Sequence, residues 1–158
     1  IWKQKIFVSK EKFDSLKRNH CNVGDLIFQK IGASIGAVAI VPKLDDTDTY
    51  LLSTNMMKMS VDKSIADVMF LYYLFTSNQM QNAIQKIAGG IAQPIFNFTS
   101  LKKFMIVNPP LKEQRKIVII LNIVDSKINA LESNKSKIEN LKKGLMQKLI
   151  TGQIRVKV

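Results

Sequence analysis

The feature that most constrains this chain is a long run of regularly spaced apolar residues in its last third. Alternating steps of four and three residues, counted from position 117, meet ten positions, of which eight are apolar. These eight, called the seam below, are Ile117, Leu121, Val124, Ile128, Leu131, Ile138, Leu145 and Leu149. Such a repeat is typical of a coiled coil. A helix over residues 112–150 would be roughly 58 Å long and could not bury the seam against itself, so it needs a partner.

The identity of that partner is left open by the seam. Lys135 and Lys142 occupy the two remaining positions and would weaken a simple symmetric dimer, although a polar residue can also fix the register. Residues 117–124 are apolar around most of the helix circumference, so more than one surface should cover them. The candidates are the globular part, a second helix and another subunit. An amphipathic helix lying along its own domain is the alternative.

Asn108-Pro109-Pro110 marks the start of this helix. The prolines end a strand and set the dihedral angle of a helix start, and Glu113 lies near the positive end of the helix dipole. An Asn-Pro-Pro followed by an aromatic residue holds the target amine in amino-methyltransferases. Here Leu111 replaces the aromatic residue and no glycine-rich turn for S-adenosylmethionine precedes it, so a catalytic role is not favoured.

The chain is therefore predicted to be an α+β protein in two parts. Residues 1–108 should form a small mixed globular domain of β-hairpins with a few helices, and residues 109–158 a long coiled-coil helix with a short tail. Helical spacing predicts short helices over residues 9–17, from a Ser64 cap to Phe75, and from an Asn78 cap to Ile87. Apolar runs bounded by turn residues predict strands at residues 26–28, 37–41, 50–59, 95–98 and 104–107.

Composition narrows the range of possible functions. The net charge of +12 favours nucleic acid or an acidic partner, although a basic face is often only solvated surface. The single cysteine, Cys21, excludes an internal disulfide, and neither it nor the single histidine, His20, is expected to bind metal. No catalytic triad, carboxylate pair or metal cluster is visible, so we expect no enzymatic chemistry. No apolar run approaches the length of a membrane span, and we expect a soluble protein.

Two segments are candidate DNA contacts. The first is a glycine-rich bend after the strand at 26–28, where Lys30 and Ser34 would touch phosphates; the alternative is a tight hairpin bend whose glycines supply positive φ. The second presents Gln93 and Asn97, whose amides can pair with adenine edges, although both are also ordinary loop residues. Lys102 and Lys103 follow as further basic candidates.

Several short motifs together resemble one known family. They are Gly24-Asp25-Leu26-Ile27, Lys30-x-Gly32, Ile35-Gly36, Gly89-Gly90, Pro109-Pro110-Leu111-x-Glu113-Gln114-x-x-Ile117 and Leu149-Ile150-Thr151-Gly152-Gln153-Ile154-Arg155. Their order and spacing resemble the C-terminal half of the DNA-specificity (S) subunit of type I restriction-modification systems. The start of the long helix is the most specific of these motifs.

The resemblance implies one target-recognition domain, incomplete at its N-terminus, and one conserved helical region. In that family a full subunit has two of each, the helices pair antiparallel as a spacer, and each recognition domain reads half of a bipartite site in double-stranded DNA. The helical regions also dock the modification subunits, a role expected here for Glu113 and Gln114, with the restriction subunit as a further candidate partner.

By the same resemblance the chain is non-catalytic, lies in the prokaryotic cytoplasm and holds no cofactor, since S-adenosylmethionine belongs to the modification subunit. A lone half would complete its seam by forming a homodimer or by pairing with a second S half. The alternative function is a non-enzymatic coiled-coil assembly protein whose globular head binds another protein. The two functions differ in salt response, because DNA binding weakens steeply as salt rises.

Overall fold

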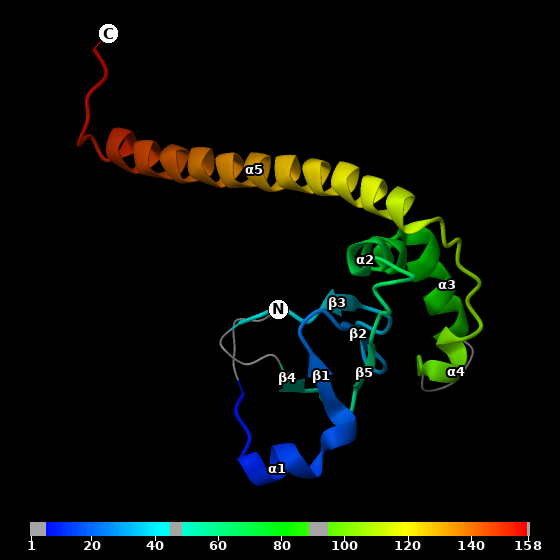
Figure 1. Cartoon of the computed structure of the whole chain (residues 1–158). Coiled ribbons are helices and arrows are strands. Elements are labelled where there is room, and N and C mark those ends of the chain that lie inside the picture. The colour runs from blue at the N-terminus through cyan, green and yellow to red at the C-terminus, as the bar shows by residue number, and fades with distance from the viewer. Residues whose placement is uncertain (1–5, 45–48, 89–94, 158) are drawn as a thin grey trace. The chain divides into compact units, whose positions relative to one another are not determined.

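The computed structural model describes residues 6–44, 49–88 and 95–157, and the chain divides into two units, Ile1–Arg115 and Lys116–Val158 (Figure 1). All strands of the described residues lie in the first unit. Helix α5 (Leu111–Ile150) begins in the first unit and forms most of the second. The predicted α+β class with a long C-terminal helix is confirmed.

The described strands form two small antiparallel sheets. They are β1 (His20–Asn22), β2 (Leu26–Gln29), β3 (Val38–Ile40), β4 (Thr49–Leu51) and β5 (Met56–Met59). One sheet has the order β3-β2-β5, with Ile27 opposite Ala39 on one side and Lys58 on the other; β1 pairs with β4. The predicted hairpin of β2 and β3 is thus confirmed. The extended segment predicted at 50–59, with an interruption at residues 53–55, is two strands that belong to different sheets.

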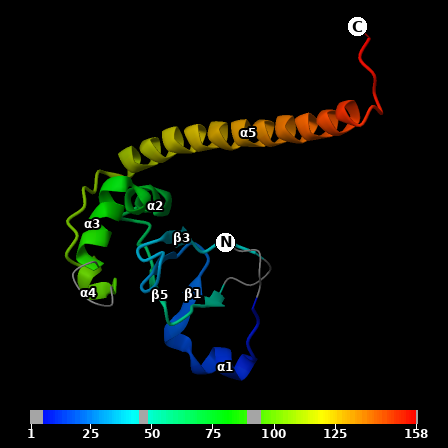
Figure 2. The same cartoon turned by 180° about the vertical axis from the view of Figure 1, so that it is seen from behind.

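The helices described in the first unit are α1 (Lys10–Ser15), the 3₁₀ turn η1 (Lys17–Asn19), α2 (Val68–Thr76), α3 (Asn78–Ala88) and α4 (Phe98–Leu101). Helices α2 and α3 lie side by side in both views (Figure 2). The predicted cap Ser64 is wrong, because Ser64 is bonded to Asp62, while the Asp67 carboxylate accepts the first free amides of α2. The predicted cap Asn78 is also wrong: Ser77 Oγ accepts from the amide of Met80.

The strands predicted at 95–98 and 104–107 are absent from the described residues. Asn97 Oδ1 accepts a hydrogen bond from the amide of Ser100 at 3.0 Å and so starts helix α4 instead. Residues 104–107 follow α4 without regular structure. The cap formed by Asn97 in this apolar segment outweighs the strand propensity of its phenylalanines.

The core lies on both faces of β2. Phe28 is fully buried, and its ring meets Phe75 of α2 edge-on at 5.1 Å and Phe96 at 6.1 Å. On the opposite face, Ile27 packs with Cys21 and Val41. Successive residues of β2 thus point to opposite faces of the sheet and belong to two apolar clusters. This makes β2 the centre of the first unit. No described helix is both long and apolar enough to cross a membrane.

Candidate functional site

The bend between β2 and β3, residues 30–37, is called the glycine bend below. Gly32 and Gly36 have φ angles of 107° and 81°, a region that favours glycine. Inside the bend the amide of Ile35 donates to Gly32 O at 3.1 Å, and that of Ala37 to Ser34 O at 2.9 Å. The predicted tight bend is confirmed, and it leaves Ser34 exposed at its tip.

Helix α3 packs against the glycine bend and is hydrogen-bonded to it. Gln81 Nε2 donates to Gly36 O at 3.0 Å, and Gln85 Nε2 donates to Ile35 O at 2.8 Å. Ile84 packs so closely that a Cβ on Gly36 would lie 2.5 Å from its Cγ2 atom. Sequence reasoning missed these residues, although two glutamines four positions apart share a helix face and were the available signal.

The glycine bend is also tied to the second candidate segment. The amide of Phe96 donates to Lys30 O at 2.9 Å, and the amide of Lys30 donates to Asn55 O at 2.7 Å. Because Phe96 is fully buried, its neighbour Asn97 is fixed beside the bend while remaining exposed. The structure therefore brings together two segments that are far apart in the sequence.

The predicted DNA-contacting residues fall into three groups. Lys30 is half-buried, and Gln93 lies outside the described residues. The exposed ones are Ser34, Asn97, Lys102 and Lys103. Lys102 forms the C-cap of α4, so this short helix separates the two lysines from Asn97. The side-chain oxygen of Asn97, which adenine pairing would use, already accepts from the amide and hydroxyl of Ser100.

The single histidine and cysteine have structural surroundings. The His20 ring stacks on Phe13 at 3.9 Å, and His20 Nε2 lies 2.7 Å from Phe13 O. Burial raises the pKa of the Cys21 thiol, and the nearby Asp25 carboxylate raises it further. Among the described residues, no three His, Cys, Asp or Glu side chains are placed to hold a metal ion.

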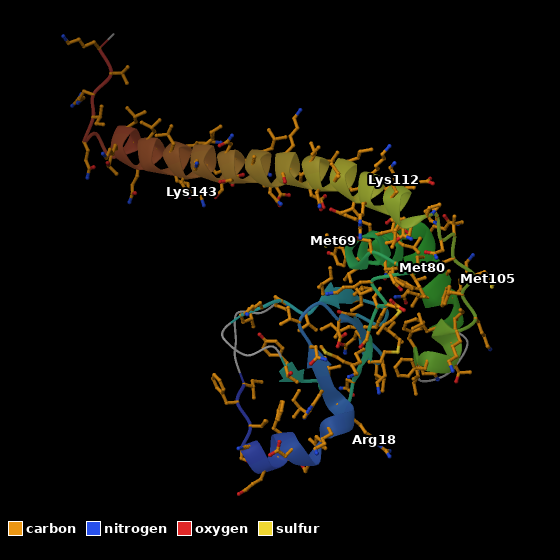
Figure 3. All side chains as sticks on the ribbon, in the orientation of Figure 1. Arg18, Met69, Met80, Met105, Lys112 and Lys143 are labelled. Atoms are coloured by element: carbon orange, nitrogen blue, oxygen red, sulfur yellow. The ribbon has the colours of Figure 1, made fainter. Side chains whose placement is uncertain are left out.

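Most of the seam is uncovered in the single chain. Ile117 and Leu121 are half-buried. The other six are between 42% and 66% exposed: Val124, Ile128, Leu131, Ile138, Leu145 and Leu149. Polar side chains such as Lys112 and Lys143 project from the same helix (Figure 3).

The apolar face of α5 is wider than the seam. A shallow groove near its C-terminal end is lined by Ile138, Leu141, Lys142, Leu145, Met146, Leu149 and Ile150. Sequence reasoning missed Leu141, which lies three residues after Ile138 and four before Leu145 and so extends the repeat in a second phase. Closer to the first unit, Ile119, Ile120 and Ile123 are between 58% and 64% exposed and lie outside the seam.

The two residues predicted to dock a modification subunit differ in their surroundings. Glu113 is exposed in the first turn of α5. Gln114 is fully buried, and its side chain is hydrogen-bonded inside the first unit. A partner protein can therefore contact Glu113 directly, whereas Gln114 can act only through the residues it holds.

Comparison with known proteins gives a consistent answer. Residues 3–140 match the family model described as type I restriction modification DNA specificity domain. The MjaX specificity subunit of Methanocaldococcus jannaschii is 30% identical over 92% of this chain and 34% of its own length. The type I restriction enzyme MjaVIII specificity subunit of the same organism is 27% identical over 99% of this chain and 37% of its own length.

A solved chain shares the fold. It comes from a structural study of complex assembly and conformational transition of the type I R-M system, with a TM-score of 0.61 at 16% identity over 82% of this chain and 31% of that chain. The present chain thus spans about a third of the length of the curated relatives it matches. Since the family model covers most of its residues, the chain belongs to the type I restriction modification DNA specificity domain family.

Proposed function

We propose that this chain is a non-catalytic DNA reader joined to a spacer helix, and that it gives a type I restriction-modification complex its sequence specificity. The observation that carries the proposal is the hydrogen bond from Phe96 to Lys30, which sets the segment of Asn97 beside the glycine bend. A rigid bend and a capped helix start, both exposed, can present side chains to DNA without a large loss of conformational entropy on binding. The family match supports this assignment.

Within this surface the residues have different roles. Lys30, Lys102 and Lys103 neutralise phosphates, which positions the first unit without reading sequence. Ser34 contacts the DNA backbone from the tip of the glycine bend. Asn97, whose oxygen caps α4, reads a base edge by donating from its Nδ2 atom. Gln93, which lies outside the described residues, keeps its predicted role as a base reader. The excess of basic residues over the whole chain favours this polyanionic partner.

The seam pairs antiparallel with a second helix of the same kind, from another copy of the chain or from another half of a longer subunit. Six seam residues left exposed in the single chain support this proposal, because a soluble coiled coil buries such a stripe. The groove around Leu141 widens the paired surface at the C-terminal end. Paired helices would set the distance between two readers.

The modification subunit, which would carry S-adenosylmethionine, docks on the second apolar face of α5. Ile119, Ile120 and Ile123 are exposed there and lie outside the seam, so helix pairing leaves them free. Glu113 lies on the same helix, two turns earlier, and supplies a charged contact at the edge of this face. The restriction subunit is a further partner of the same complex.

One observation favours the alternative of a head that binds protein. Met105 and Val107 are 96% and 80% exposed, and Met105 projects outward (Figure 3). Large exposed apolar side chains are typical of protein interfaces. Binding through them would be nearly independent of salt, whereas affinity for DNA falls log-linearly as salt rises.

The test compares variants of Asn97 on duplexes selected from a random pool. Asn97→Ser keeps an N-cap but removes the amide, so base preference should change by about 1–3 kcal/mol at one position with little loss of stability. Lys103→Ala should weaken all duplexes alike and lower the salt slope by about one. Unchanged preference in Asn97→Ser would exclude Asn97 as a reader, and equal binding of all duplexes by the unsubstituted chain would exclude the proposed function.

A further inference from the structure

Gln114 is an unusual residue for the first turn of a helix, because it is a fully buried polar side chain. Its Oε1 atom accepts from the amide of Asp67 at 2.8 Å. Its Nε2 atom donates to Pro109 O at 2.7 Å, to Asn108 Oδ1 at 3.0 Å and, with a longer bond, to Ile65 O at 3.3 Å. Both ends of the amide are thus satisfied, as a buried amide requires.

These bonds connect two helix starts. Asp67 is the N-cap of α2, and its carboxylate accepts from the amides of Met69 and Phe70. Asn108 and Pro109 precede α5, separated from its first residue only by Pro110. One side chain therefore holds the start of α2, the approach to α5 and the first turn of α5 within the first unit.

An apolar side chain could fill the same space, but it would not fix the orientation of the first turn of α5. A hydrogen bond is lost when donor and acceptor separate beyond about 3.5 Å or turn out of line, whereas apolar contact tolerates sliding. A glutamine in this place therefore favours one arrangement of the first helical turn over its neighbours. By contrast, Lys112 in the same turn is exposed to solvent.

Resting on the proposed function, we propose that Gln114 is a positioning residue: it fixes the first turn of α5 to the first unit, and this restraint makes paired chains selective for the distance between two half-sites. Gln114 does not contact DNA in this role. Its loss should leave the half-site sequence unchanged and relax the spacing.

The experiment uses the full chain carrying Gln114→Met, with Gln147→Met as the matched control, since Gln147 is exposed on the same helix. Each protein selects duplexes from one random pool, and the selected sequences give the half-site and the distribution of spacings. Gln114→Met should keep the half-site but lower the preference for the unsubstituted chain's spacing about tenfold, the effect of one mismatched base pair. Gln147→Met should keep both. Near-ultraviolet circular dichroism checks that the aromatic core stays packed.

Each outcome has one meaning. An unchanged spacing with an unchanged half-site in Gln114→Met would overturn this inference and leave the proposed function intact. A selection by the unsubstituted chain that yields no half-site would overturn the proposed function, and a half-site at no fixed spacing would overturn the inference alone. If Gln114→Met does not fold, Asn108→Ala decides, because it removes one of the bonds to Nε2; a spacing distribution identical to that of the unsubstituted chain would then refute the inference.

Discussion

The two units of this chain differ in the burial of their large apolar side chains. In the first unit Phe28, Ile84 and Phe96 are completely buried by the chain itself. In the second, Leu131 and Ile138 are 60% and 66% exposed, and no described residue of this single chain covers them. The first unit thus contains its own core, whereas the apolar face of α5 stays largely exposed among the described residues of the single chain.

The largest expected effect is on the association of two chains through α5. Replacing Leu131 and Ile138 together by glutamate places two buried charges on each helix of a pair, and should raise the dissociation constant by at least about 1,000-fold, or about 4 kcal/mol. Sedimentation equilibrium measures this change. Ser126→Glu with Ser133→Glu adds the same charge at the same seven-residue separation, outside the seam, and should leave the pair intact. A dimer that persists in the seam variant would show that the interface lies elsewhere.

The next effect is confined to the first unit. Phe28→Ala removes the ring that packs on Phe75 and Phe96, and should lower the free energy of unfolding by about 3–5 kcal/mol. Phe98→Ala is the control, since Phe98 is 52% exposed and should cost less than about 1 kcal/mol. Urea unfolding followed by near-ultraviolet circular dichroism measures both. Equal losses would mean that Phe28 is not the centre of the core.

Sequence patterns predicted the elements of the two units that depend on neighbouring residues. The repeat from Ile117 gave α5, and glycines beside apolar runs gave the β2–β3 hairpin. The hydrogen bonds that build the candidate site join residues far apart in sequence, such as Gln114 with Asp67 and Gln85 with Ile35, and no local pattern contains them. Asn97 shows a different limit, because its local sequence fits both a base reader and a helix cap, and the structure uses its side-chain oxygen as a cap.

A smaller effect tests the fit of the glycine bend. Gly36→Ala adds a Cβ that meets Ile84 in a backbone conformation unfavourable to alanine, so we expect a loss of about 3 kcal/mol. Gly24→Ala has a similar φ of 89° but open space around the added Cβ, and should cost about 1 kcal/mol. Thermal unfolding compares the two variants. Similar costs would indicate that α3 does not hold the bend closely.

The smallest effect is a pH dependence. Burial raises the pKa of Cys21 in the folded state, so the unfolded chain loses the thiol proton first and the free energy of unfolding should fall as pH rises above the ordinary thiol pKa. The fall should be at most about 1.4 kcal/mol per pH unit and should be missing from Cys21→Ala. Urea unfolding between pH 7 and pH 10 measures the difference between the two proteins. Parallel curves would contradict the burial of the thiol.

The most direct test of the contrast between the units is sedimentation equilibrium of the unsubstituted chain at micromolar concentration, combined with far-ultraviolet circular dichroism. We predict twice the mass of one chain together with the helix content of a folded α5. A monomer in which α5 is fully helical would contradict the claim that the exposed seam requires a second helix.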